Sequence, residues 1–192
     1  MNPTPEKTSV MAPFILMLFL YFIVGLFTVI NQQFQVPLKS ALLPHDGNMT
    51  NALVTLLNFS WFLAYPFSEG FATRWVDRLG YRKTSVYSLL IFIAGLGFYE
   101  AAVLLHIYAP SYITIMGNPI FTGFFVFLSG SFVIGMAVTI LQVVTGLYLD
   151  VNPVGKTTPL QRQMIGGTTN SIGMAIGPLV VSYIIFYGIP LH

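Results

Sequence analysis

The distribution of charged residues constrains this chain more than any other feature of its sequence. No Asp, Glu, Lys or Arg occurs in residues 8–38, 47–68, 101–149 or 163–192. A helix needs about 20 mainly apolar residues to cross a hydrocarbon layer that is roughly 30 Å thick. All four stretches are long enough, and only 7% of all residues are charged, whereas soluble domains carry roughly 25%. The sequence therefore predicts an integral membrane protein.

The apolar segments predict about five transmembrane helices. A further apolar segment, 84–106, is interrupted only by Glu100 and His106, and the stretch from Pro110 to Pro119 has the composition of a loop. The predicted helices cover residues 13–35, 51–75, 84–106, 121–149 and 160–187. Because the apolar runs do not alternate as barrel strands do, and because backbone groups in lipid must be satisfied internally, we expect an all-α fold.

Lysine and arginine predict the orientation of these helices. If the N-terminus is inside, the outer segments carry only Lys39, and the inner segments carry the remaining Lys and Arg residues. This bias favours a cytoplasmic N-terminus. We therefore expect a cytoplasmic tail at 1–12, a transmembrane region at 13–188 and a truncated loop at 189–192, in the plasma membrane (the inner membrane of a bacterium).

Amide side chains within the predicted helices are the first candidates for a binding site. Asn31, Gln32 and Gln35 belong to a run of four amides in five residues, and Gln142 and Asn170 lie in the fourth and fifth helices. Amides are costly in lipid unless they face protein or a water-filled cavity, so the first run predicts a cavity. Hydrogen bonding between helices is the alternative, and it stays open for Gln142 and Asn170.

Two carboxylates and two glycines in the predicted helices complete the set of candidates. Glu69 and Glu100 are possible proton sites, but each lies within about two turns of water, which favours snorkelling to the interface. Gly173 and Gly177 have the four-residue spacing that lets helices approach closely, so packing is the favoured interpretation. The chain has no cysteine and no metal-ligand spacing, so we expect no metal and no cofactor.

A charged segment joins the second and third predicted helices. It contains Asp77, Arg78, Gly80, Arg82 and Lys83. The short connection requires a tight turn, and Gly80 can take the positive φ that a turn often needs. Asp77 is expected to cap or neutralise the neighbouring cations. An ordinary positive-inside loop is the alternative interpretation.

Several of these segments together resemble the major facilitator superfamily. The segment 73–83 is similar to its cytoplasmic signature, with Thr73 in place of the opening glycine. The segments 25–32 (GLFTVINQ), 141–142 (LQ) and 162–173 resemble the fucose/glucose–galactose:proton symporter branch on its first, fourth and fifth helices. The resemblance covers about 14–185. It implies an N-terminal fragment of a twelve-helix transporter, with the charged segment as a conformational gating loop.

The resemblance also implies the function and the partners of the chain. It implies alternating-access transport of a hexose or deoxyhexose, with the five amides lining the substrate side and a C-terminal half as partner. The branch has an aspartate in place of Gln32, which cannot carry a proton, so facilitation and coupling to another ion are both open. The alternative is a non-transporting scaffold that packs on partner helices through Gly173 and Gly177. Neither an enzyme nor a nucleic-acid partner is expected.

Overall fold

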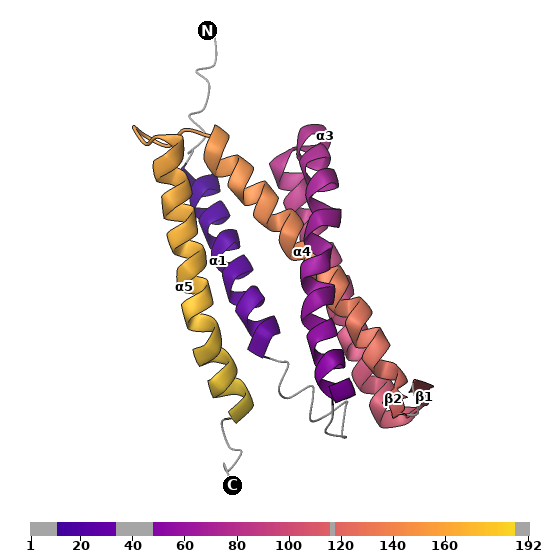
Figure 1. The fold of residues 1–192 in the computed structure, drawn as a ribbon. Helices are drawn as coiled ribbons and strands as arrows, with labels where there is room; N and C mark the ends of the chain where they lie inside the picture. The colour runs from indigo at the N-terminus through magenta and orange to yellow at the C-terminus, as the bar shows by residue number, and fades with distance from the viewer. Residues whose placement is uncertain (1–10, 34–47, 116–117, 187–192) are drawn as a thin grey trace.

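The computed structural model describes residues 11–33, 48–115 and 118–186, and most of them are helical (Figure 1). The elements are α1 (Met11–Gln33), α3 (Asn48–Tyr108), α4 (Thr122–Val151), α5 (Pro159–Phe186) and the strands β1 (Tyr112–Ile115) and β2 (Asn118–Phe121). Among the described residues, these four helices are long and apolar enough to cross a membrane. The bounds of α1, α4 and α5 lie close to the expected ones, and Met11 and Ala12, expected in the tail, already belong to α1. The helices expected at 51–75 and 84–106 are parts of the one element α3.

The element α3 folds back on itself at Gly80. At about 1.5 Å per residue, a straight helix of 61 residues would be about 90 Å long. Gly80 instead has φ 77° and ψ 166°, so two helical segments meet at a reversal of the chain (Figure 1). Trp75 and Tyr87 face each other across it, with ring centroids 6.1 Å apart. The predicted positive φ of Gly80 is confirmed.

The helix α4 lies at the centre of the bundle. It packs on α3 along much of its length and also on α1 and α5, while α5 packs mainly on α1 (Figure 1). The largest buried cluster joins residues of three helices, among them Leu20 of α1, Trp61 of α3 and Val144 of α4. A second cluster around Phe121 and Phe124 closes the end of the bundle that carries the two strands.

Several threonine hydroxyls inside the helices are satisfied by their own backbone. Thr28, Thr139 and Thr145 each donate a hydrogen bond to the carbonyl oxygen four residues earlier, at 2.8 to 2.9 Å. Such local bonds let Ser and Thr lie in an apolar environment without a partner on another helix. Large apolar side chains such as Ile15, Phe67 and Leu179 are exposed, as expected for helices that face lipid.

The stretch between α3 and α4 was expected to be a loop, and this expectation is wrong for most of it. The strands β1 and β2 pair antiparallel, with Tyr112 opposite Phe121 and Ile115 opposite Asn118. The β-branched and aromatic residues of β1 favour an extended backbone, and Pro119 is tolerated because a two-stranded sheet has only edges. The hairpin lies at the opposite end of the bundle from the reversal of α3 (Figure 1).

Candidate functional site

Three hollows lie in a row between α1 and the two helical segments of α3, which meet at Gly80. The first is a groove of about 590 Å³ that begins at Ala12 and Arg82, the second is a small hollow of about 30 Å³, and the third is a cavity of about 200 Å³. The groove and the small hollow share Leu89, and the small hollow and the cavity share Phe27 and Phe92. The hollows therefore follow one another along α1.

The cavity is lined almost entirely by apolar and aromatic side chains from three helices. Its lining residues are Phe27, Ile30 and Asn31 of α1, Trp61, Phe92, Leu96 and Tyr99 of α3, and Phe127 and Ile134 of α4. Concave sites with aromatic walls and a few polar groups are typical of small-molecule binding. This cavity is the candidate functional site.

Two polar side chains of the cavity wall, Asn31 and Tyr99, form a cluster with Ser131, which does not itself line the cavity. The Tyr99 hydroxyl lies 2.9 Å from the Ser131 hydroxyl and donates a long hydrogen bond of 3.4 Å to Oδ1 of Asn31. The ring of Tyr99 stacks on Phe127 with centroids 3.9 Å apart and an interplanar angle of 5°. Among the described residues, the amide nitrogen of Asn31 has no hydrogen-bond partner. The cluster can therefore offer a ligand both donors and acceptors.

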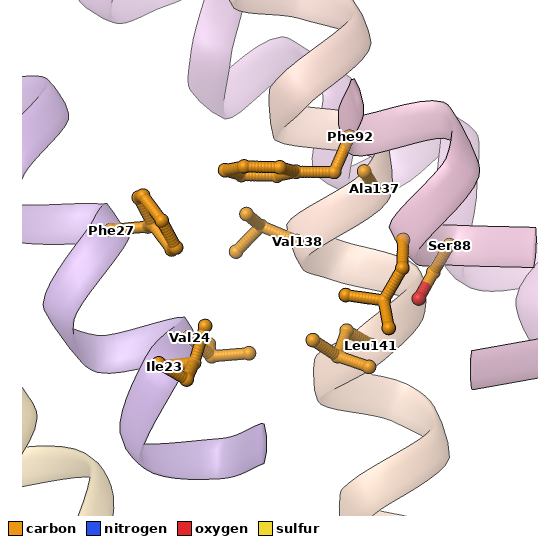
Figure 2. A pocket seen from close by; sticks show the side chains of 9 residues that line it. Ile23, Val24, Phe27, Ser88, Phe92, Ala137, Val138 and Leu141 are labelled. Atoms are coloured by element: carbon orange, nitrogen blue, oxygen red, sulfur yellow. The ribbon is translucent and has the colours of Figure 1, made fainter. Parts of the chain in front are cut away.

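The small hollow shows how the cavity is closed toward the middle of the bundle. Figure 2 shows Phe27 of α1 at the left and Phe92 of α3 at the top of this hollow, and Val138 and Leu141 of α4 also line it. The rings of Phe27 and Phe92 are 4.6 Å apart and tilted by 56°, which is a favourable aromatic contact. This aromatic pair is thus the boundary between the cavity and the small hollow.

The structure does not bring the five predicted amides together. Asn31 lines the cavity, but Gln32 is exposed and Gln35 lies outside the described residues. Gln142 is half-buried on α4 and is not part of the cavity wall. Asn170 donates a 2.9 Å hydrogen bond from Nδ2 to the carbonyl oxygen of Tyr21, so it joins α5 to α1. For these residues, a shared substrate surface stays a prediction.

Glycines allow the backbones of α1 and α5 to approach closely. A Cβ atom on Gly25 would collide with the carbonyl oxygen of Asn170, and one on Gly173 would collide with the carbonyl oxygen of Phe22. A Cβ on Gly177 would lie 3.2 Å from Cβ of Val29. The expected packing function of the glycine pair is confirmed within the chain. The scaffold alternative assigned these two glycines to a partner helix, but α1 already covers them.

The charged side chains of the segment 77–83 and the two carboxylates of α3 are exposed. Asp77, Arg78, Arg82 and Lys83 make no ion pair with described residues, so Asp77 does not neutralise the cations by direct contact as expected. Their long side chains reach water from the reversal of α3, where solvation of each separate charge competes well with pairing. Glu69 and Glu100 are exposed on α3, and a proton site at either residue stays a prediction.

Arg162 is the most buried charged side chain among those that the structure describes, with 2% of its surface exposed. It donates hydrogen bonds to the carbonyl oxygens of Leu149, Asp150 and Thr157, at 2.6, 2.7 and 2.8 Å. The first two belong to the last turn of α4, where carbonyl groups lack helical partners and the helix dipole favours a cation. Arg162 therefore fixes the connection between α4 and α5.

Sequence reasoning found Asn31 but missed the side chains that surround it. Trp61, Tyr99, Ser131 and Phe127 were not among the candidate residues. The one available signal was the hydroxyl of Tyr99 within a long apolar segment, which needs a partner when it is buried. The identity of that partner depends on how α1, α3 and α4 meet, and a single sequence does not state this.

No family model, curated protein or solved structure matches this chain. The candidate site therefore rests on its own geometry and chemistry.

Proposed function

We propose that this chain binds a hexose or deoxyhexose in the cavity between α1, α3 and α4, as the N-terminal part of a sugar transporter. The observation that carries the proposal is the pair of polar side chains Asn31 and Tyr99 in the wall of an otherwise apolar cavity, where the Tyr99 hydroxyl contacts both Asn31 and the buried Ser131. Burying such groups in a membrane protein has a cost, and a polar ligand is a reason to bear it.

The chemistry of the cavity suits a sugar ring. A sugar presents hydroxyl groups at its edge and C–H groups on its faces. The amide of Asn31 and the hydroxyl of Tyr99, which line the cavity, can each donate to and accept from the hydroxyl groups of a sugar. Trp61 and Phe92 line the same cavity and offer flat apolar surfaces to the ring faces.

Two crossings by α3 would make five spans in the proposed membrane arrangement. The segments before and after Gly80 would each be about 40 to 50 Å long at 1.5 Å per residue, enough for a hydrocarbon layer of roughly 30 Å. The start of α1, the reversal of α3 and the connection between α4 and α5 lie at one end of the bundle (Figure 1). Most Lys and Arg residues belong to this end, which supports a cytoplasmic location for it.

The relation to the major facilitator superfamily is part of the same proposal. It rests on the sequence similarity of segments 25–32, 73–83, 141–142 and 162–173, and on the tight turn at Gly80 within the second of them. In that arrangement, a C-terminal half would complete the site and allow alternating access. Gln142 and Gln32 would then face this half rather than the cavity described above.

Intrinsic fluorescence tests sugar binding directly. The chain has two tryptophans, and Trp61 lines the cavity whereas Trp75 lies by the reversal of α3. The Trp75→Phe variant leaves Trp61 as the only tryptophan. In lipid nanodiscs, titration with glucose, galactose or fucose should produce a saturable change in its emission. The Asn31→Leu substitution in the same background should weaken this binding about tenfold, because it removes a hydrogen-bonding partner.

A second single-tryptophan variant controls for changes in fluorescence that do not come from the cavity. Trp61→Phe retains Trp75 outside the cavity, and its emission should not respond to any of the three sugars. Sugar binding in the cavity is contradicted if no sugar changes the Trp61 emission, or if Trp75 responds with the same concentration dependence.

A further inference from the structure

The groove at the arginine-rich end of the bundle is not used by the proposed sugar site. It lies between the start of α1 and the segment of α3 that follows Gly80, and its volume is about 590 Å³. Its lining residues are Ala12, Pro13, Leu16, Met17, Leu20, Tyr81, Arg82, Ser85, Val86, Leu89 and Tyr148.

The walls of the groove are apolar and open to the surroundings of the bundle. Leu16 and Val86, on opposite walls, expose about half of their surface at 54% and 48%, whereas Met17 and Leu20 form a buried floor. The groove remains open because α1 packs on α5 and α4, and α3 packs on α4. In a membrane, an acyl chain would find an apolar channel here.

The mouth of the groove is positively charged. Arg82 lines it, Lys83 is the next residue of the same helical segment, and Arg78 lies just before the reversal at Gly80. Asp77 is the only carboxylate between Glu69 and Glu100. Arg82 is exposed, and within the described part of the chain it makes no ion pair, so its guanidinium is available to an anion.

We propose that this groove binds an anionic phospholipid. The phosphate accepts hydrogen bonds from Arg82, and one acyl chain lies along Leu16 and Val86. Arginine binds phosphate through two parallel N–H groups, and basic pockets between transmembrane helices recognise anionic head groups. A zwitterionic lipid fits the apolar walls equally well, but its cationic head group is repelled by the three nearby cations. The proposal requires that the helices lie in a membrane, and it does not depend on sugar binding.

Native mass spectrometry of the purified full chain tests this site. The probes are phosphatidylglycerol and phosphatidylcholine with identical acyl chains, and glycerol phosphate serves as a soluble competitor. We expect phosphatidylglycerol to bind the wild-type chain more tightly than phosphatidylcholine, and glycerol phosphate to compete poorly because it lacks acyl chains. The Arg82→Gln substitution should weaken phosphatidylglycerol binding about fivefold, the contribution of one basic side chain at an anionic membrane surface.

Matched controls separate the groove from the general charge and bulk of α3. Arg74→Gln removes an exposed cation of the same helix that does not line the groove, and it should leave the affinity within about twofold. Val86→Trp should fill the groove and weaken binding of both lipids, whereas Leu90→Trp, on the same helix but outside the groove, should not.

Three results would overturn the proposal. One is equal affinity of the wild-type chain for the two lipids, which would leave an apolar groove without recognition of a head group. Another is phosphatidylglycerol binding that neither Arg82→Gln nor Val86→Trp weakens. The third is a dimer that carries no lipid and dissociates in the Val86→Trp variant, which would assign the groove to a second copy of the chain.

Discussion

The two sides of α1 are built in opposite ways. Toward α5, glycines bring the backbones so close that a single methyl group would collide with a carbonyl oxygen. Toward α3, aromatic and long aliphatic side chains keep the helices apart and leave the groove, the small hollow and the cavity. Small residues allow close contact that fixes two helices, whereas large residues in imperfect contact leave room for a ligand. The contrast leads us to expect that contacts with α5 contribute most to stability and that the proposed binding uses the side toward α3.

The largest expected loss of stability comes from a substitution between α1 and α5. Gly173→Leu would force a side chain into the backbone of Phe22, so it should destabilise the fold by about 3 kcal/mol or more. Thermal unfolding in detergent, followed by circular dichroism, measures this loss. Gly167→Leu is the matched control on the same helix, because a Cβ atom there meets nothing within 4 Å. Equal destabilisation by both substitutions would contradict the tight interface.

A somewhat smaller loss is expected at the connection between α4 and α5. Arg162→Met removes three hydrogen bonds to backbone carbonyl groups and should reduce the free energy of unfolding by about 2 to 3 kcal/mol. Arg162→Lys keeps the charge but cannot form the same fork of hydrogen bonds, and it should recover only part of the loss. Chemical unfolding of the three proteins gives these differences. If Lys restores full stability, the charge alone matters.

A substitution in the cavity between α1 and α3 should change sugar affinity much more than stability. Tyr99→Phe removes only the hydroxyl between Asn31 and Ser131, so the fold should lose about 1 kcal/mol or less. Sugar affinity, followed through Trp61, should fall about tenfold, because a hydroxyl of the ligand then loses its partner. Tyr108→Phe is the control, since this exposed residue lies at the end of α3. A large loss of stability with unchanged affinity would make the Tyr99 cluster structural.

The smallest effects are expected for the two carboxylates of α3. Glu69→Gln and Glu100→Gln change exposed side chains, and each should alter the free energy of unfolding by no more than about 0.5 kcal/mol. Sugar affinity measured between pH 5 and pH 8 should keep the same pH dependence in both variants. A pH dependence that disappears in one of them would identify that carboxylate as a proton site.

The sequence predicted the helices well because their determinants are local. Charge-free stretches of sufficient length specify membrane-crossing helices, and the reversal at Gly80 follows from the freedom of glycine to take positive φ. The hairpin of β1 and β2 was missed because two four-residue strands carry too short a pattern, and Pro119 suggested a loop.

The candidate site was predicted only in part, for a physical reason. The cost of amides in lipid pointed to Asn31, but it could not distinguish a cavity from a contact between helices. Asn170 has the same chemistry, and its amide bonds the backbone of α1 instead. The difference depends on which helix lies opposite, as it does for the meeting of Tyr99 with Ser131.

Protection of an introduced cysteine from maleimide labelling tests whether the sugar binds in the cavity between α1, α3 and α4. The chain has no cysteine, so Leu96→Cys places a single thiol at the cavity wall, and Gly167→Cys places one on the exposed face of α5. A saturating hexose should slow maleimide labelling of Leu96→Cys severalfold and leave Gly167→Cys unchanged. Equal labelling rates of Leu96→Cys with and without each of glucose, galactose and fucose would contradict sugar binding in this cavity.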